Sequence, residues 1–464
     1  MNQDRSFLGT QPIGWLLWKL AIPTVIAQIV NMLYNIVDRI YIGHMPESGA
    51  LALTGLGVCT PIILIVSAFA ALISSGGAPR ASIFMGKGDK ESAERTLGGC
   101  FAIQIILSIL LTAALLIWGG DLLMAFGCSE NTIGYATDYM RIYALGTLFV
   151  QLTLGMNAFI TAQGFARQGM ITVLIGALIN IALDPLLIFT FNMGVRGAAL
   201  ATIISQGVSC VWVVAFLRGK TTYLRLRRRY IKPDMRIVLP CMALGAATFI
   251  MQSSESVLSV CFNSSLVRYG GDIAVGAMTI LSSTMQFALL PMQGIAQGSQ
   301  PISSYNFGAG NMDRVKKTFR LLLITCFGYS IAVWAFVMLL PAVFAGIFAD
   351  NAELIAFTAR ALRIYCAALG LFGIQIACQM TFVSIGSAVC SIIVAVVRKF
   401  VLLIPLIYIM PHVLPDPVMG VYAAEPIADV LAIAFTVTLF TIQFRQTVSA
   451  SSNCRVVKDE STTP

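Results

Sequence analysis

Long apolar runs recur along the whole chain and constrain its fold more than any other feature. A helix needs about 20 mostly apolar residues to cross the roughly 30 Å of hydrocarbon in a bilayer. Of the 464 residues, 58% are hydrophobic and only 11% are charged, against about 25% charged residues in an ordinary soluble domain. We therefore predict an all-α polytopic membrane protein with twelve transmembrane helices, near residues 13–37, 51–78, 97–118, 139–163, 170–190, 196–217, 237–262, 274–302, 319–345, 361–385, 388–410 and 420–444.

The basic residues sit mainly on one side of these spans. If the N-terminus is cytoplasmic, the inner segments hold most of the 30 Lys and Arg, as the positive-inside rule requires. The densest patch, TTYLRLRRRYIKPDMR, would then contact anionic lipid head groups. No folded soluble domain accompanies it, so we expect no nucleic-acid partner. Segment 1–12, the linker 218–236 and the tail 446–464 are all predicted to be cytoplasmic.

Cysteine and histidine usage argues against metal chemistry and against an enzyme. The eleven cysteines are scattered without paired spacing, which is typical of small packing residues. The two histidines, His44 and His412, fall in predicted outer loops, so no histidine metal cluster or proton relay forms within the membrane. No nucleophile and base come together in the pattern. We expect no catalytic residue and no cofactor.

Two halves of the chain repeat one another. APRASIFMGKGDKESAERT, residues 78–96, matches QPISSYNFGAGNMDRVKKT, residues 300–318, and Pro79 and Pro301 are 222 residues apart. The same spacing joins Arg141 to Arg363. Six spans per half bring the second half back into the membrane in the same orientation. The prediction is two pseudo-symmetric parallel six-helix bundles, 13–217 and 237–445, with a substrate cavity between them.

The predicted fifth span, LIGALINIALDPLLIFTF, holds a carboxylate beside a helix breaker. A lone charge at mid-bilayer is costly and marks function by default. Asn180 and Asp184 are four residues apart and share a helix face, while Pro185 leaves the carbonyl of Ile181 without its helical partner. Converging oxygens suit either a proton held between carboxylates or a small hard cation such as sodium. The other acids within spans are Asp38, Glu255, Glu425 and Asp429.

The chain resembles the multidrug and toxic compound extrusion (MATE) transporters from about residue 12 to 445. The resemblance rests on IPTVIAQIVNMLYNIVDRIYIG in the first span, on the loops MGKGDKESAERT and NFGAGNMDRVKK, and on GVRGAALATIISQ in the sixth span. It implies secondary active export of lipophilic, often cationic compounds in exchange for protons or sodium ions, by alternating access. It also implies a monomer among lipids in the inner membrane of a bacterium, with both termini cytoplasmic.

The branch that this chain most resembles has its coupling-ion site in the N-terminal lobe. The matching positions here are Asp38, Asn180, Asp184 and Thr202, and the first three would bind Na⁺ if transport is sodium-coupled. The alternative for Asp38 is a pair with Arg39 or a helix cap. In the C-terminal lobe the position opposite Asp184 is Ile404.

Other C-lobe features leave two readings open. Glu255, together with Arg398 and Lys399 of the eleventh span, forms either an ion pair or a transport site. Glu425 and Asp429 either satisfy Arg398 or line the cavity. The candidate substrate lining is polar and flexible: Asn31, Tyr34, Asn157, Gln252, Glu255, Met285, Gln286 and Met292. The methionines are equally open to a packing role. The rival function is a flippase for lipid-linked or polysaccharide precursors, whose anionic cargo favours interior arginines.

Overall fold

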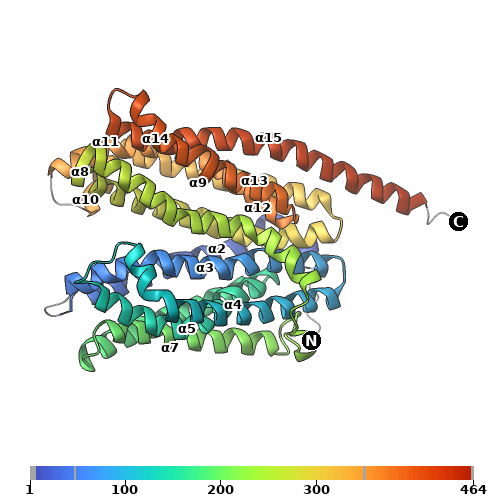
Figure 1. The fold of residues 1–464 in the computed structure, drawn as a ribbon. Coiled ribbons are helices and arrows are strands. Elements are labelled where there is room, and N and C mark those ends of the chain that lie inside the picture. Colours follow the sequence, from blue (N-terminus) through green and yellow to red (C-terminus); the bar gives the residue numbers. More distant parts are fainter. Residues whose placement is uncertain (1–6, 46–48, 349–351, 461–464) are drawn as a thin grey trace. The chain divides into compact units, whose positions relative to one another are not determined.

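The computed structural model describes residues 7–45, 49–348 and 352–460, and every regular element in these ranges is helical (Figure 1). The α-helices are α1 (Phe7–Thr10), α2 (Ile13–Gly43), α3 (Gly49–Gly86), α4 (Lys90–Ala125), α5 (Ile133–Ala162), α6 (Ala166–Pro185), α7 (Val195–Arg218), α8 (Met235–Gly308), α9 (Met312–Leu339), α10 (Pro341–Phe348), α11 (Ala352–Tyr365), α12 (Phe372–Ser384), α13 (Ala388–Val396), α14 (Ile404–Val413) and α15 (Pro417–Glu460). Four short helices of other geometry join them: the π-helices η1 (Leu186–Thr190) and η4 (Val397–Leu403), and the 3-10 helices η2 (Arg228–Tyr230) and η3 (Leu369–Leu371).

The described residues contain enough long apolar helices for the predicted membrane topology. Eleven helices have the length and composition to cross a bilayer, and a twelfth crossing is a pair of helices bent by 43°, Ala352–Tyr365 and Leu369–Ser384. Helix α8 supplies two crossings, because the backbone breaks at Gly271, where φ is +61°. The predicted all-α membrane fold is confirmed, and the predicted tenth span, 361–385, is the bent pair.

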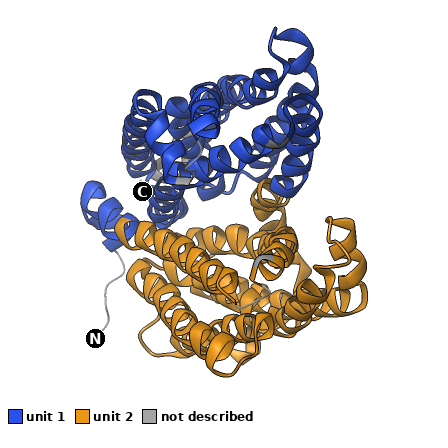
Figure 2. Ribbon diagram, turned by 90° about the vertical axis from the view of Figure 1, so that its left-hand side faces the viewer, with its two compact units in different colours: residues 1–21, 254–464 blue, residues 22–253 orange. Residues whose placement is uncertain are grey.

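The chain divides into two compact units (Figure 2). Unit 1 comprises residues Met1–Ala21 and Ser254–Pro464, and unit 2 comprises Ile22–Ser253. The dividing points therefore lie inside α2 and α8, whereas we expected the division at the linker 218–236. The division into compact units places the first turns of α2 in unit 1 and the first turns of α8 in unit 2. It does not test the predicted functional lobes, 13–217 and 237–445, which stay a prediction.

Small residues explain why the beginning of α8 packs within unit 2. A Cβ atom at Gly76 of α3 would overlap the carbonyl group of Cys241, and a Cβ atom at Gly245 would overlap the carbonyl group of Leu72. Two glycines facing each other's helix allow the backbones of α3 and α8 to approach closely. The rings of Phe69 and Phe249 meet beside this contact, with centroids 5.0 Å apart.

Polar side chains fasten the segments that precede α2 and α8. In unit 2, the Gln163 Oε1 atom accepts hydrogen bonds from the backbone amides of Tyr223 and Leu224, at 3.1 and 2.9 Å. In unit 1, the Arg314 guanidinium donates to the backbone carbonyl of Leu8 at 3.2 Å, and Asn306 donates to the same carbonyl at 2.9 Å. Each segment is thus held by the unit that also contains the start of the helix it leads into.

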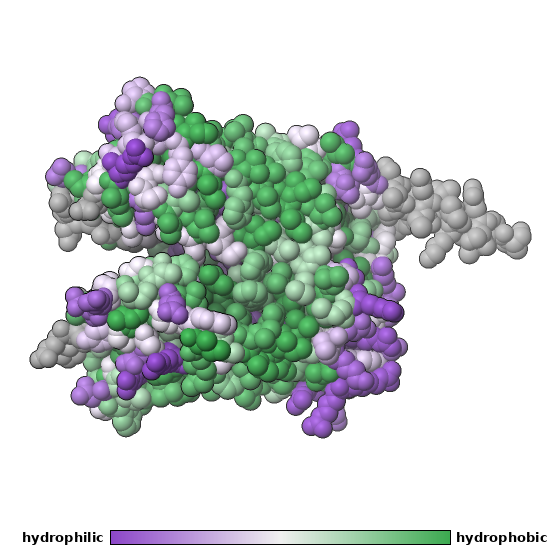
Figure 3. All heavy atoms as spheres, viewed as in Figure 1, coloured by the Kyte–Doolittle hydropathy of each residue, from purple (hydrophilic) through white to green (hydrophobic). Residues whose placement is uncertain are grey.

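The surface of each unit fits a bilayer. On the face shown in Figure 3, apolar residues gather around the middle of the helices and hydrophilic residues gather at the helix ends. Several exposed side chains on α4 are large and apolar, including Ile109, Leu110 and Ile117, which are 60–66% exposed. Within unit 2, α5 packs against α3, α4 and α7; within unit 1, α15 packs against α12 and α14.

Candidate functional site

The fifth span changes its backbone geometry at Pro185. Helix α6 ends there, and the π-helix η1 follows directly, with the amide of Phe191 donating to the carbonyl of Leu186 at 2.9 Å. Proline removes one helical donor, and π-helical turns are frequent at functional sites. The local disturbance that the sequence indicates therefore lies immediately after Asp184.

Asn180 and Asp184 face each other on α6 and are almost completely buried, with 1% and 0% of their surfaces exposed. The Asn180 Nδ2 atom donates to Asp184 Oδ1 at 3.4 Å. The remaining oxygens, Asn180 Oδ1 and Asp184 Oδ2, have no hydrogen-bond partner in the described part of the chain. Buried polar atoms are nearly always satisfied, so these two adjacent acceptors, one of them on a carboxylate without a basic partner, are able to bind a proton or a cation.

Asp38 of α2 supplies a third such oxygen. It is buried, its Oδ1 atom has no partner among the described residues, and its charge acts on Asp184. Its neighbour Arg39 donates instead to Thr60 Oγ1, at 3.4 Å. No ion pair of Asp38 with a basic group is present within the described ranges. The geometry favours an available carboxylate over the alternative pair with Arg39.

Thr202 approaches the same region from α7. Its hydroxyl donates to the carbonyl of Ala198 at 3.1 Å, and the electrostatic surroundings of Tyr139 on α5 include both Thr202 and Asp38. Tyr34, one helical turn before Asp38, is influenced by both carboxylates. The sequence reasoning missed Tyr139, whose ring stacks on that of Tyr143 with centroids 6.3 Å apart. No sequence signal connects it with Asp38.

The unpaired oxygens of unit 2 fit a proton or a small hard cation. Among the described residues, no group of three or more His, Cys, Asp or Glu side chains could hold a metal ion. The set in unit 2 instead combines two carboxylates, Asp38 and Asp184, with the amide oxygen of Asn180. Sodium and other hard cations take oxygen ligands, and two carboxylates near one another favour binding of a positive charge.

Unit 1 holds the other acids of the spans in ion pairs. The Arg398 Nε atom donates to Asp429 Oδ1 at 2.8 Å, and Arg398 Nη2 donates to Glu425 Oε1 at 3.2 Å. The guanidinium also lies 4.7 Å from the centre of the Phe372 ring. Of the two readings that the sequence left open, the structure supports the one in which Glu425 and Asp429 satisfy Arg398.

Glu255 is paired as well. The Lys399 Nζ atom donates to Glu255 Oε1 at 2.7 Å, with the lysine side chain 5% exposed and the glutamate side chain 57% exposed. Both basic residues lie in the π-helix η4. This π-helix ends just before Pro405, whereas η1 begins just after Pro185. The ion pair is therefore present, and the carboxylate of Glu255 still reaches the surface.

The other candidate substrate residues fall into two groups. Met285 and Met292 are buried in the hydrophobic core of unit 1, where their geometry favours the packing role. Asn31 and Gln286 are exposed, Tyr34 and Gln252 are half-buried, and Asn157 donates to the carbonyl of Gly169 at 3.2 Å. Their part in substrate binding stays a prediction.

Comparisons with known proteins give one consistent result. The family model described as MatE matches residues 23–186 and 246–409. The multidrug export protein MepA of Staphylococcus haemolyticus (strain JCSC1435) is 25% identical over 439 residues, covering 93% of this chain and 94% of that protein. MepA of Staphylococcus aureus (strain NCTC 8325 / PS 47) is 24% identical over 457 residues, covering 97% and 98%.

Solved structures agree in fold. A MATE crystal structure in the bent conformation has a TM-score of 0.90 at 24% identity and covers 97% of this chain and all of that chain, 100%. A transporter of the MOP superfamily from Pyrococcus furiosus, described as having a binding pocket of reverse polarity that suggests a different function, has a TM-score of 0.89 at 24% identity, covering 97% and 99%. At this level of identity the two likenesses show the fold of the chain.

Proposed function

The chain belongs to the MatE family, and on that premise we propose that it is a multidrug efflux transporter that exports lipophilic, often cationic compounds in exchange for protons or sodium ions. The single observation that carries ion coupling is the set of buried, unpaired oxygens on Asp38, Asn180 and Asp184. A coupling site has to bind its ion and release it again, and acids without a protein counter-charge are able to do both.

The charge inside the two units supports cationic cargo. Unit 2 contributes two carboxylates without a basic partner, and the cluster in unit 1 contains three acids, Glu255, Glu425 and Asp429, against two bases. A flippase for lipid-linked or polysaccharide precursors handles large anions, for which uncompensated arginines would be the expected feature. Here Arg398 is compensated by two carboxylates, which weakens that alternative.

In the proposed transport cycle, Asp38, Asn180 and Asp184 bind and release the coupling ion. When Asp38 and Asp184 carry a proton or hold a sodium ion with Asn180, their negative charge is neutralised and no longer attracts a cationic compound. When the ion leaves, the carboxylates are negatively charged and favour a cation again. Exchange of a coupling ion for a cationic drug then follows from competition for the same negative charge, which is a coupling free energy between two ligands.

The test uses the full chain reconstituted in vesicles with a fluorescent cation as cargo. We expect export against the concentration gradient when an inward proton or sodium gradient is imposed, and loss of export when an ionophore collapses that gradient. Parallel titrations of the purified protein with sodium and with pH identify the coupling ion. Cation transport that responds to neither gradient contradicts ion coupling, and transport of a polyprenyl phosphate in place of the cation supports the flippase.

The proposal includes location and topology. We infer a multi-pass protein of a bacterial inner membrane, with membrane lipids as neighbours, a monomeric state and both termini in the cytoplasm. The basic segment 218–236 and the basic residues around Arg314 support this orientation. A reporter that fluoresces only in the cytoplasm, fused after residue 464, checks it.

A further inference from the structure

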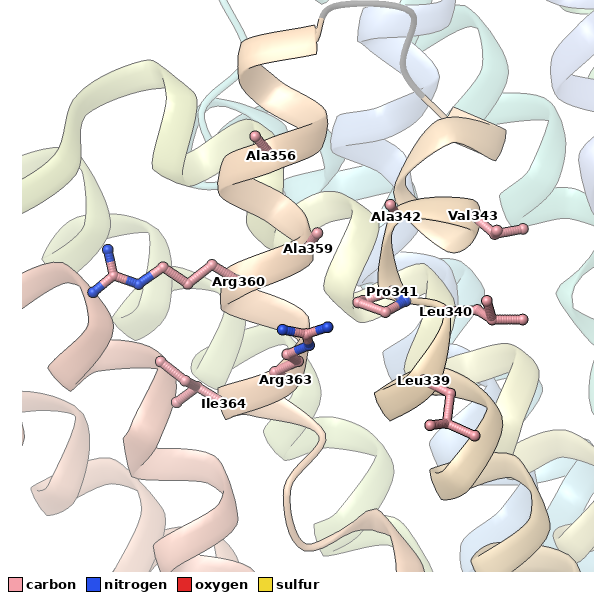
Figure 4. Close-up of a pocket in the computed structure, with 10 residues that line it drawn as sticks. All are labelled: Leu339, Leu340, Pro341, Ala342, Val343, Ala356, Ala359, Arg360, Arg363 and Ile364. Atoms are coloured by element: carbon pink, nitrogen blue, oxygen red, sulfur yellow. The ribbon is translucent and has the colours of Figure 1, made fainter.

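A cavity of about 580 Å³ opens in unit 1 at the junction of α9, α10 and α11 (Figure 4). Eight of its ten lining residues are apolar, and the other two are arginines. The lining comprises Leu339, Leu340, Pro341, Ala342, Val343, Ala356, Ala359, Arg360, Arg363 and Ile364. This combination of apolar walls with fixed positive charge differs from both acidic regions described above.

The two arginines play different parts. Figure 4 shows the Arg363 side chain directed from α11 toward Pro341 and Leu340, across the cavity, whereas Arg360 extends to the other side of α11. The Arg360 Nη2 atom lies 3.8 Å from Asp416 Oδ2. Arg363 has no ion pair or side-chain hydrogen bond within the described ranges. The residue is exposed, and its five N–H donors, which have no acceptor from those ranges, are available to an anion at the mouth of the cavity.

The cavity lies at the depth where lipid head groups are expected. Leu339 is the last residue of the span Met312–Leu339, and α11 opens the bent span that follows. Apolar side chains beside the cavity are highly exposed: Leu339 is 75% exposed, Val343 is 53% exposed and Ile347 is 68% exposed. A ligand bound here would contact the Arg363 guanidinium at the end of a span and an exposed apolar surface beside it.

We propose that this cavity binds the head group of an anionic phospholipid, with Arg363 contacting the phosphate and the acyl chains lying on the exposed apolar side chains of α9 and α10. The guanidinium fork matches a phosphate in a bidentate arrangement. A free phosphate ion is disfavoured, because the apolar walls offer it few further donors. An anionic phospholipid fits both the guanidinium and the exposed apolar side chains, because it carries a phosphate and acyl chains in one molecule.

The experiment measures thermal unfolding of the purified full chain in detergent during titration with phosphatidylglycerol, phosphatidylcholine or inorganic phosphate. We expect phosphatidylglycerol to raise the midpoint more than phosphatidylcholine, and inorganic phosphate to have no effect. Arg363→Ala should lower the apparent affinity for phosphatidylglycerol in this titration about tenfold, because it removes one charge-assisted contact to the phosphate. The matched control is Arg141→Ala, the exposed arginine at the same position of the first repeat, which should keep the wild-type response.

Other outcomes overturn the proposal. A full phosphatidylglycerol response in Arg363→Ala removes the role of the guanidinium, and an equal response to phosphatidylcholine removes charge recognition. A response to inorganic phosphate removes the lipid. If Arg363→Ala does not fold, Ala359→Glu tests the same point, because it places a carboxylate in the lining beside Arg363 and should abolish the preference for the anionic lipid. Retention of that preference in Ala359→Glu also overturns the proposal.

Discussion

Unit 2 and unit 1 carry acids at corresponding places of the repeat but treat them in opposite ways. Asp38 in unit 2 has no basic partner among the described residues, whereas Glu255, at the corresponding place in unit 1, is paired with Lys399 at 2.7 Å. Asp184 is similarly without a basic partner, and its counterpart in unit 1 is the apolar Ile404. The repeat thus preserves the helices while the charge pattern has diverged.

This difference in pairing between the two units indicates which acids are able to exchange an ion. A buried acid that is paired with Arg or Lys has its counter-charge built into the protein, and breaking such a pair is strongly destabilising. An acid without one must take its positive charge from outside, as a proton or a cation. On this reasoning unit 1 is the structural member of the pair, and unit 2 is the one that we propose exchanges ions.

The largest effect on transport should come from Asp184→Asn. We expect gradient-driven export to fall at least tenfold, to background, because the substitution removes the charge that a coupling ion neutralises. Stability should be unchanged or higher, since a buried charge has been removed. Vesicle transport at matched protein levels, together with thermal unfolding, measures both. A variant that fails to accumulate in the membrane would assign Asp184 a structural role and erase the contrast between the units.

Arg398→Met should give the largest effect on stability. It leaves Glu425 and Asp429 buried without their cation, which costs about 3 to 5 kcal/mol for a broken buried pair. The unfolding midpoint should drop accordingly, and the triple variant that adds Glu425→Gln and Asp429→Asn should recover most of the loss. An unchanged midpoint for Arg398→Met alone would show that the ion pairs of unit 1 are not structural.

The two unpaired acids of unit 2 should behave as one group. After either Asp38→Asn or Asp184→Asn, the remaining acid can no longer share a proton or complete a cation shell. The double variant should therefore export no less than the weaker single variant. Transport rates of the three variants at equal membrane levels provide the measurement. Additive losses, with partial export in each single variant, would mean that the acids act separately.

Glu255→Gln should have a smaller effect that depends on cargo. The substitution leaves Lys399 positive and without its partner, so export of cationic compounds should weaken by about threefold relative to neutral ones, consistent with a partly exposed ion pair. Competition between a cationic and a neutral substrate measures this. An equal loss for both classes rejects charge recognition by Glu255.

The smallest effect compares the two inner loops of the repeat. Asp89 caps α4 by accepting a hydrogen bond from the backbone amide of Ser92 at 3.0 Å, whereas Asn311 caps α9 without a side-chain hydrogen bond. Asp89→Ala should cost about 1 kcal/mol, and Asn311→Ala should cost less. Thermal unfolding of the two variants makes the comparison, and equal losses would mean that the Asp89 cap contributes nothing of its own.

The Asp89 cap also has a pH dependence. Hydrogen bonding to Ser92 lowers the pKa of the Asp89 carboxyl below its usual value. Its contribution to stability is therefore present above the usual carboxyl pKa and is lost as the pH falls through the lowered pKa. The difference between wild type and Asp89→Ala should disappear in that acidic range.

Apolar length and internal repetition were enough to predict the helices, because each crossing needs a run of hydrocarbon side chains and little else. The break at Gly271 falls between the predicted spans 237–262 and 274–302, where polar residues interrupt the apolar pattern. The bend between α11 and α12 was harder, because the residues 366–368 that join them are apolar. Within the site, the shared face of Asn180 and Asp184 follows from their spacing on one helix. Tyr139 did not follow from spacing, because its approach depends on how α5 packs against other helices.

The ion pairs of unit 1 show a second limit of sequence reasoning. Arg398 and Glu425 are on different helices, so their separation in sequence does not give their distance in space. The sequence therefore left open whether Glu425 pairs with Arg398 or lines a cavity, and the 3.2 Å contact favours the pair. The same holds for Asp38, which has Arg39 as a sequence neighbour. On a helix, adjacent residues point in different directions, and Arg39 contacts Thr60 instead.

The assignment of residues Met1–Ala21 to unit 1 has a consequence for biosynthesis. Leu16, Leu17 and Leu20 are buried in that unit, yet the next stretch of it begins only at Ser254. A ribosome adding roughly 5 to 20 residues per second needs tens of seconds to reach that point. During this delay the earliest part of the chain waits in the membrane without its final neighbours, so unit 2 has the opportunity to fold first and the first turns of α2 are completed last.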